Sequence, residues 1–341
     1  MPPRASPPPR DLFTWFAWLS TAAALVLICI GGLVTSHGAG MSVPDWPNTY
    51  GYNLFFFPIS KWVGGIFYEH THRLFASGVG LLTTVLAVWL WRRERLSPVR
   101  WLGVAAFFGV VGQGVLGGLR VTLLKDEIGI VHATVAQLFL VLLAVIATVT
   151  SRAWRQAVPG RPVSPGLRAW LAFATGLILG QLILGAMMRH QHAGLAIPDF
   201  PLAYGHWWPR TDAEAILGYN QARVEVHASS PITAFGVVLQ MAHRIGALTI
   251  LVTVAIAGVR TWRERGPRCG LTRVAGAWLG LIVGQVGLGA ATIWTGKSAD
   301  IATAHVAVGA TILVLGSMLV LWSHRAHFPF AAPKSSGKPT V

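Results

Sequence analysis

The chain has 341 residues, of which 53% are hydrophobic and only 11% are charged, whereas about 25% of the residues of an ordinary soluble domain are charged. A soluble surface of this size needs many more charged side chains, so the composition excludes a soluble protein and indicates an integral membrane protein. The formal net charge of +15 would also fit a nucleic-acid-binding protein, so the position of the charges along the chain matters.

Eight apolar stretches of about 20 residues follow one another, each long enough to cross a hydrocarbon core about 30 Å thick. They lie at residues 14–35, 68–90, 101–120, 130–150, 169–188, 236–259, 274–294 and 301–322. No alternation of polar and apolar residues competes with a helical interpretation. The proline-rich N-terminus is followed by no small-residue cleavage site, so we expect the first stretch to be a retained span.

The segments outside the spans differ in charge according to the side on which they lie. On the side that holds both termini they carry 18 Lys and Arg against 3 acidic residues, whereas the opposite side, counted together with its helix ends, carries 9 against 9. The positive-inside rule places the first side, with both termini, in the cytoplasm. The excess charge is then a topology signal that also attracts anionic lipid. We therefore expect membrane lipid, and no nucleic acid, as a partner.

The second four spans repeat the first four. The segment GMSVPDWP at 40–47 returns 154 residues later as GLAIPDFP at 194–201, and Gln113 and Gly117 return as Gln285 and Gly289. Because each unit has four spans, the two halves are expected to lie parallel, related by an axis along the membrane normal. The sequence thus predicts an all-α polytopic membrane protein of two parallel, pseudo-repeated four-helix bundles.

The predicted organisation follows from these spans. It comprises a cytoplasmic tail at 1–13, an N-terminal half at 14–150, a cytoplasmic linker at 151–168, a C-terminal half at 169–322 and a cytoplasmic tail at 323–341. The repeated GQxxLG pattern of the odd-numbered spans is typical of close helix packing. Cys29 and Cys269 form no CxxC or CxxCH motif, which argues against disulfides, zinc knuckles and covalently attached heme.

Four histidines lie inside the spans at duplicated positions. His72 corresponds to His243 and His132 to His305, and each lies near the outer end of an even-numbered span. An ionisable side chain at that depth is costly unless it has a partner. Two facing helices that each carry a histidine can clamp an iron porphyrin between two imidazoles, so we predict two axial pairs, His72 with His132 and His243 with His305. A zinc site is less favoured, because each half supplies only two strong ligands and no cysteine. For any single histidine, the alternative is a packing role with hydrogen bonds to its ring.

The two halves differ beside the first histidine of each pair. Glu69 precedes His72 by three residues, and Gln240 stands at the equivalent place. A carboxylate can accept or relay protons, so the N-terminal half is the predicted reaction site and Glu69 the predicted catalytic residue. The alternative is a local ion pair with Arg73. Arg73 and Arg244 follow the histidines and can either meet heme propionates or extend their side chains towards the membrane surface.

The other outer polar residues carry weaker signals. We expect the two PDWP-like turns to cap the four-helix units; a contact with substrate is the alternative. The remaining outer histidines lie in or beside loops, where solvated roles are commoner than ligation; they are His37, His70, His190, His192, His206 and His227.

Taken together, these motifs resemble those of the heme A synthase family, the membrane enzymes that convert heme O to heme A for cytochrome oxidase assembly. The resemblance extends from the first span to the eighth. It is carried by Glu69-x-x-His72-Arg73, His132, His243-Arg244, His305, the segment GGLVTSHGAGMSVPDWP at 31–47 and the duplication.

The resemblance implies a division of labour between the halves. His72 and His132 are associated with the substrate heme O, Glu69 with catalysis, and His243 and His305 with a heme b cofactor. The implied reaction is stepwise oxidation of the C8 methyl group of heme O, through a hydroxymethyl group, to a formyl group. Some family members have a cysteine pair in the first outer loop of each half, and this chain has none at either place.

The resemblance also implies a multi-pass protein of the bacterial cytoplasmic membrane, with heme O synthase and cytochrome oxidase assembly factors as partners; whether the chain forms a homo-oligomer stays open. An alternative function is a two-heme membrane cytochrome b that only carries electrons to or from quinol. The difference between Glu69 and Gln240 at equivalent positions favours the enzyme, because an electron carrier does not require a titratable group in one pocket only. A transporter is disfavoured by the parallel repeat and by the lack of charged residues at the membrane midplane.

Overall fold

A computed structural model describes residues 11–157, 161–223 and 230–325. Eight helices in this part of the chain are long and apolar enough to cross a membrane. They are α1 (Leu12–Ser36), α2 (Gly64–Arg93), α3 (Ser97–Thr122), α4 (Asp126–Thr150), α6 (Pro165–His190), α8 (Ala234–Arg265), α9 (Gly270–Trp294) and α10 (Ala299–Ser323). Each contains one predicted apolar stretch, so the prediction of eight helical spans is confirmed. The helices extend past the apolar stretches because polar residues at their ends continue the helical hydrogen bonding.

The remaining regular structure is short. Two further helices, α5 (Arg152–Gln156) and α7 (Ala213–Gln221), and three 3-10 turns, η1 (Leu54–Phe56), η2 (Ile59–Lys61) and η3 (Ala193–Leu195), lie between the long helices. The described residues contain no strand, only two isolated β-bridges, Thr49 with Tyr52 and Ala203 with His206. The protein is therefore all-α, as predicted.

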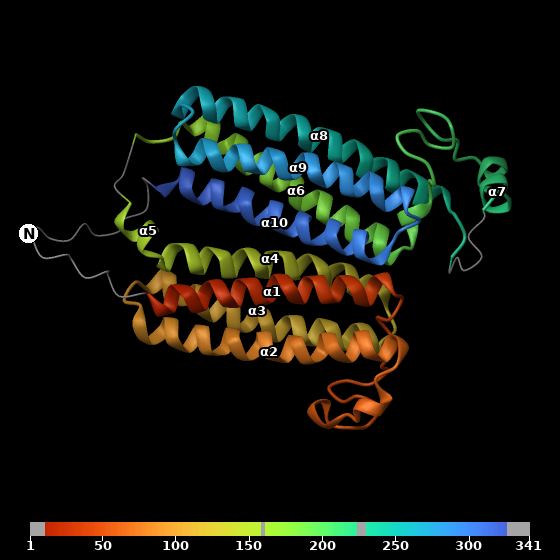
Figure 1. The fold of residues 1–341 in the computed structure, drawn as a ribbon, viewed down its shortest axis with the longest axis horizontal. Helices are drawn as coiled ribbons and strands as arrows, with labels where there is room; N and C mark the ends of the chain where they lie inside the picture. Colours follow the sequence, from red (N-terminus) through yellow and green to blue (C-terminus); the bar gives the residue numbers. More distant parts are fainter. Residues whose placement is uncertain (1–10, 158–160, 224–229, 326–341) are drawn as a thin grey trace, which may run out of the picture.

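The long helices form two groups of four. In the first group α1 contacts α2, α2 contacts α3, α3 contacts α4, and α4 closes the ring onto α1; α6, α8, α9 and α10 form a second ring in the same way. The two groups meet through α1 and α4 on one side and α6 and α10 on the other (Figure 1). Consequently α2 and α4 lie diagonally across the first ring, and α8 and α10 across the second.

Each ring is filled by apolar side chains and leaves others facing outwards. Leu86 and Leu143 are buried in the first ring, and Trp278 and Leu313 in the second. Large apolar side chains on the outer surface, such as Phe108, are well exposed. Helices that are apolar all round suit a lipid surrounding, in which outward apolar side chains carry no penalty.

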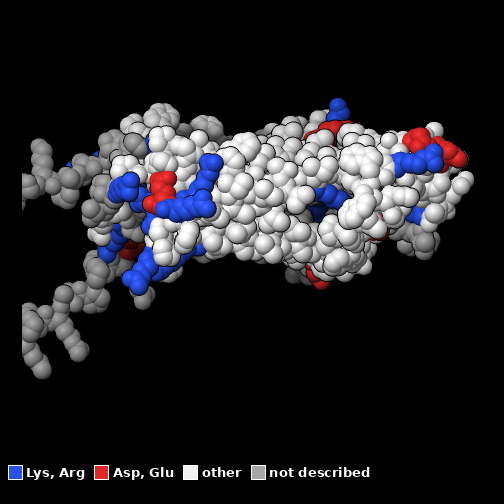
Figure 2. Space-filling view, turned by 90° about the horizontal axis from the view of Figure 1, so that it is seen from above, with Lys and Arg blue, Asp and Glu red and all other residues white. Residues whose placement is uncertain are grey.

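The start of α1 and the end of α10 lie at the same end of the bundle (Figure 1). Figure 2 shows Lys and Arg side chains gathered at that end and a largely uncharged band across the middle of the molecule. That this basic end faces the cytoplasm remains a prediction from the charge count.

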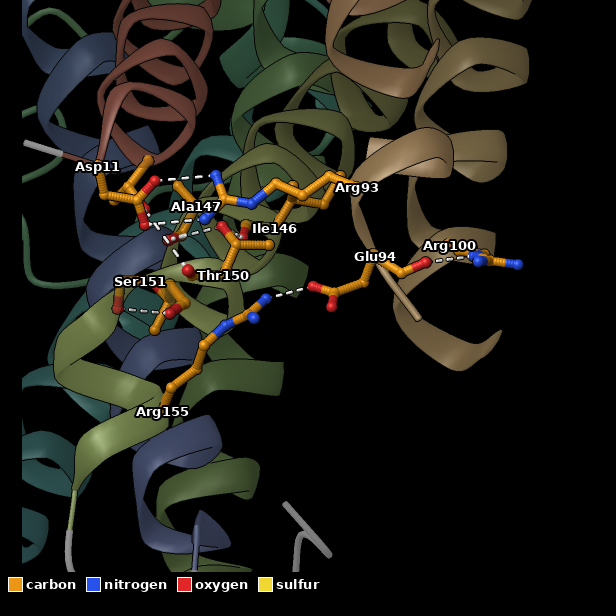
Figure 3. Close-up of polar contacts among 11 residues, drawn as sticks. Asp11, Arg93, Glu94, Arg100, Ile146, Ala147, Thr150, Ser151 and Arg155 are labelled. Atoms are coloured by element: carbon orange, nitrogen blue, oxygen red, sulfur yellow. Dashed lines mark hydrogen bonds and ion pairs between the residues drawn. The ribbon is translucent and has the colours of Figure 1, made fainter. Parts of the chain in front are cut away.

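Ion pairs and a hydrogen bond at the basic end tie α1, α2, α3 and α5 together (Figure 3). Asp11, just before α1, pairs with Arg93 at the end of α2 at 2.8 Å. Glu94, buried after α2, pairs with Arg155 of α5, and its carbonyl accepts a hydrogen bond from Arg100 of α3. Hydrogen bonds from Arg93 hold the pKa of the Asp11 carboxyl below its ordinary value, against the opposing effect of partial burial. The charged form of Asp11 is therefore part of the folded arrangement.

The two outer loops share a set of hydrogen bonds. The Asp45 carboxylate accepts the backbone N–H groups of Tyr50 at 2.7 Å and Gly51 at 2.8 Å. In the second half the Asp199 carboxylate accepts the equivalent N–H groups of Tyr204 and Gly205 at the same distances. Both glycines have a φ of 77°, a left-handed conformation that favours glycine. The predicted turns are thus closed by the aspartate that each one contains.

The hydroxyls of the loop tyrosines bind in the same way. Tyr50 donates to the carbonyl of Ser42 at 2.6 Å, and Tyr204 donates to the carbonyl of Ala196 at 2.5 Å. The Tyr204 ring also stacks on Tyr219 of α7, with ring centroids 3.5 Å apart. Burial first, and then the neighbouring Tyr219 and Asp199, raise the pKa of Tyr204 to about 12. The hydroxyl therefore stays protonated and continues to donate at neutral pH.

Candidate functional site

The four span histidines come from diagonally opposite helices. His72 of α2 and His132 of α4 belong to the first ring, and His243 of α8 and His305 of α10 to the second. The ring centroids of His243 and His305 are 6.4 Å apart. Because an imidazole nitrogen binds a metal such as zinc at about 2.0–2.1 Å, two rings at this separation can face a single metal ion between them. The geometry of the second pair thus fits a bis-imidazole site.

Each of these histidines lies against a glycine of a neighbouring helix. In the first half, a methyl group added at Gly31 would lie 3.1 Å from Cε1 of His72, and one added at Gly117 would lie 3.5 Å from Cε1 of His132. In the second half, a methyl group added at Gly185 would lie 3.4 Å from Cε1 of His243, and one added at Gly289 would lie 3.3 Å from Cε1 of His305. The glycines come from α1, α3, α6 and α9, the helices that flank α2, α4, α8 and α10. A glycine at each place therefore leaves the space that the imidazole occupies.

Glutamines support three of the four histidines. The side-chain amide of Gln113 donates to the backbone carbonyl of His132 at 3.2 Å, and Gln285 donates to that of His305 at 2.8 Å. Gln181 donates to the carbonyl of His243 at 2.7 Å, whereas its first-half counterpart is Leu27. Each glutamine precedes the facing glycine by four residues, one helical turn. The GQxxLG pattern, interpreted above as close packing, therefore also positions the histidine helices.

The hydrogen bonding of the imidazoles argues against the packing alternative. In all four rings the Nδ1 atom is buried and has no hydrogen-bond partner among the described residues. A packing histidine in a folded protein normally has its buried nitrogens paired. Hydrogen bonding within the protein therefore does not account for Nδ1 of these rings, and the separation of His243 and His305 fits ligation of one heme iron between them. The described residues contain no group of three or more His, Cys, Asp or Glu that could hold a metal ion.

Glu69 is buried, with 4% of its surface exposed. Its carboxylate accepts the backbone N–H of Val43 at 2.9 Å and pairs with Arg73 at 2.8 Å. Gln240 is equally buried and accepts the N–H of Ile197 at 2.7 Å. The ion pair with Arg73, the alternative considered from the sequence, is thus present. The catalytic role of Glu69 is a separate matter and remains a prediction.

The structure gives Arg73 a role that the sequence did not predict. Its guanidinium donates to the carbonyls of Val43, Asp45 and Asn48 at 2.7 to 2.9 Å. Arg244 likewise donates to the carbonyls of Asp199 at 2.6 Å and Leu202 at 2.8 Å. Both arginines therefore hold the outer loops on the helix ends, while a contact with heme propionates remains a prediction.

Two histidines expected to be solvated are buried, so that expectation was wrong for them. His70 is 1% exposed, bonds Thr49 through Nδ1 at 3.0 Å and packs against Phe57 and Trp62. His190 is 8% exposed. The outer loop folds back over α2 and covers His70, a path that the local sequence does not reveal. His37, His192 and His206 are exposed, as expected, and His227 lies outside the described residues.

Residues 14–317 match the family described as cytochrome oxidase assembly protein, COX15-CtaA. The chain belongs to this family. It is 30% identical to the heme A synthase of Shouchella clausii over 285 residues, which cover 81% of this chain and 85% of that protein. It is 28% identical to the heme A synthase of Rhizorhabdus wittichii, covering 93% and 95%, and 27% identical to that of Geobacillus kaustophilus, covering 95% and 96%.

Membership of the cytochrome oxidase assembly family confirms the resemblance found in the sequence. Together with the eight membrane-length helices and the bacterial relatives, it makes the chain a multi-pass protein of the bacterial inner membrane. It also favours a synthase over the two-heme cytochrome b that served as the alternative.

Proposed function

We propose that this chain is a heme A synthase that oxidises the C8 methyl group of heme O, through a hydroxymethyl group, to the formyl group of heme A. The observation that carries the proposal is the duplicated set of imidazoles whose buried Nδ1 atoms have no hydrogen-bond partner among the described residues, each ring facing a glycine, in a chain of this family. Curated relatives of the chain are named heme A synthase.

The two halves divide the work in this proposal. His72 and His132 hold the substrate heme O, and His243 and His305 hold a heme b cofactor. A bound heme supplies the oxidising and electron-carrying chemistry. The chain's own side chains fix the position of the porphyrin: the glycines leave space for the imidazoles, and the glutamines hold the histidine helices in register.

Glu69 is the proposed catalytic residue of the first half. Its carboxylate can hold a proton at Oε1 or Oε2, which the amide of Gln240 cannot do. Arg73 and Val43 hold this carboxylate below the outer loop, so its position is defined before substrate enters. Because both substrate and product are large and mainly apolar, a site within the bilayer suits transfer from heme O synthase and onward to cytochrome oxidase assembly factors.

The deciding experiment is expression of the full chain together with a source of heme O, followed by extraction and separation of the hemes. Heme A or its hydroxylated intermediate is the expected product. Recovery of heme b alone, with heme O unchanged, would overturn the proposal and would favour the two-heme cytochrome. The variant His243→Ala serves as a control for the cofactor site, because it should remove heme b from the purified protein.

A further inference from the structure

Arg120, in the last turn of α3, has a buried hydrogen-bond donor with no acceptor. Its Nη2 atom pairs with Asp126 Oδ1 at the start of α4 at 3.2 Å, and its side chain is 15% exposed. Its Nε atom is buried and has no hydrogen-bond partner within the described residues. A guanidinium donor left unpaired in a buried place is costly. A missing acceptor, such as a carboxylate, would explain this arrangement.

The guanidinium of Arg120 lies beside the first histidine pair. Gly117, which faces His132, stands one helical turn earlier on the same face of α3. A methyl group added at Gly40 would lie 2.6 Å from Nη1 of Arg120, so the guanidinium also touches the loop that carries Val43 to Glu69. Its charge interacts with the imidazoles of both His72 and His132. Arg120 thus stands at the outer rim of the proposed substrate site.

Other charged groups around Arg120 leave its free donor available. Arg189 of α6 donates to the carbonyl of Gly32 and to Ser36 Oγ, and so links the two halves. His190 lies 3.9 Å from Asp126. Asp126 is 43% exposed, so it can turn towards solvent if another carboxylate takes its place.

Arg120 belongs to the first half only. The equivalent position of the second half is Thr292, whose hydroxyl donates to the carbonyl of Leu288 in its own helix at 2.8 Å. The arginines that do occur in both halves, Arg73 and Arg244, donate to loop carbonyls, although the Nε atom of Arg244 is also buried and without a partner among the described residues. Like Glu69, Arg120 therefore distinguishes the proposed substrate half from the proposed cofactor half.

We propose that Arg120 binds a propionate carboxylate of the porphyrin held by His72 and His132. An arginine and a carboxylate form charge-assisted hydrogen bonds that fix direction as well as distance. Two axial imidazoles leave a porphyrin free to rotate in its own plane, and a propionate bound at the rim stops that rotation. The C8 methyl group shares its pyrrole ring with a propionate, so Arg120 determines where the reacting methyl group lies. This inference rests on the proposed function of the first half.

The test uses the purified full chain, already loaded with heme b. It is titrated, with absorbance as the readout, first with protoheme and then, in a separate experiment, with protoheme dimethyl ester, whose propionates are uncharged. Arg120→Gln should weaken the binding of protoheme about 10- to 100-fold, the effect of losing hydrogen bonds to a charged group. The same variant should bind the ester as the unmodified chain does. Thr292→Val is the matched control and should change neither affinity. An unaltered spectrum of the resident heme b shows that each variant is folded.

A second variant acts in the opposite direction. Asp126→Asn removes the carboxylate that competes for Arg120, so protoheme should bind several-fold more tightly and the ester should not. Two results would show that Arg120 is only the structural partner of Asp126. One is that Arg120→Gln binds protoheme as tightly as the unmodified chain does, and the other is that the variant loses affinity equally for protoheme and for the ester. If the unmodified chain takes up no second porphyrin, or if uptake survives His72→Ala, the substrate site itself is wrong and the proposed function fails with it.

Discussion

The backbone N–H of Val43 donates a hydrogen bond of 2.9 Å to the carboxylate of Glu69. In the second half the N–H of Ile197 donates one of 2.7 Å to the amide oxygen of Gln240. The Gln240 amide also donates to the carbonyl of Ile197 at 3.2 Å, so the bond that a carboxylate and an amide make alike is the one accepted from the loop N–H. This contact alone does not require the negative charge of Glu69, so the charge must be explained by its ion pair with Arg73, by catalysis, or by both.

Glu69→Gln separates these roles. The amide should keep the bond to Val43, as Gln240 keeps the bond to Ile197, while the titratable oxygen is lost. We expect product formation to fall by about 100-fold or more, the usual size of a proton-transfer contribution, with the bound heme spectra unchanged. Heme extraction and absorbance spectra of the purified variant measure both. A variant that still forms heme A, or that loses its bound heme, would contradict the catalytic assignment.

Two further variants control this experiment. Glu69→Ala removes the acceptor as well, leaves the Val43 N–H unpaired, and should lower the free energy of unfolding by about 1–3 kcal/mol. Gln240→Glu places a carboxylate four residues before Arg244, as Glu69 stands before Arg73. It should leave product formation unchanged, because the second half is the proposed cofactor site.

Replacement of the glycines that face the histidines should empty one site at a time. A Cβ at Gly289 lies 3.3 Å from the His305 ring and one at Gly117 lies 3.5 Å from the His132 ring, so the branched side chain of valine would displace either imidazole. We expect Gly289→Val to lose heme b, and Gly117→Val to retain heme b but form no heme A. The heme content per chain after purification measures the first effect.

Gly280→Val is the matched control on the same helix as Gly289. A Cβ at Gly280 meets nothing within 4 Å, so this variant should retain its full heme content. Equal heme loss in Gly280→Val and Gly289→Val would mean that valine disturbs α9 in general, and the argument from the histidine contact would be wrong.

The loop aspartate Asp45 should make the stability of the first half depend on pH. Although partial burial opposes the effect, hydrogen bonds from the N–H groups of Gly51 and Tyr50 lower the pKa of Asp45 from its ordinary value of 3.8. For a carboxyl whose pKa is lowered in the folded state, the stabilisation is fully present above the ordinary value. It is lost as the pH falls through the folded-state pKa. Protonation of Asp45 should therefore loosen the loop only in acid.

Thermal unfolding of the protein in detergent from pH 7 downwards measures this dependence. The unmodified chain should lose stability more steeply below about pH 4 than Asp45→Asn does, and the variant should already be less stable at pH 7. Parallel curves for the two proteins would show that Asp45 does not contribute to the acid sensitivity.

The sequence predicted the eight helices and the four histidines for physical reasons. A stretch of about 20 apolar residues has few alternatives to a membrane span, and duplication picked out His72, His132, His243 and His305 from twelve histidines. Glu69 was found by the same comparison, as a difference between equivalent positions. Features that depend on the length of an apolar stretch or on a repeated motif can therefore be predicted from the sequence alone.

Contacts between distant segments could not be found in that way. The burial of His70 depends on the path of the outer loop over α2, and the partners of Arg73 are backbone carbonyls, which every residue has. The direction of a side chain relative to a neighbouring helix also escapes a linear pattern. The repeated Gln113 and Gly117 were visible, for example, but their contacts with His132 were not.

Arg73→Met should distinguish a loop-holding arginine from a propionate-binding one. The variant loses the hydrogen bonds to Val43, Asp45 and Asn48, each worth about 1.5–3 kcal/mol as a bond to a charged group. The loop at 41–63 should then open locally, and product formation should fall, while heme b at His243 and His305 keeps its spectrum.

Hydrogen exchange of the loop amides measures the opening directly. The N–H groups of Tyr50 and Gly51 should exchange faster in Arg73→Met than in the unmodified chain, because local opening exposes them to solvent. Arg244→Met is the matched variant and should open only the loop around Asp199. If the loop amides exchange at the unmodified rate while porphyrin binding at the first site weakens, Arg73 meets a propionate, and the loop contacts seen in the structure are not its main role.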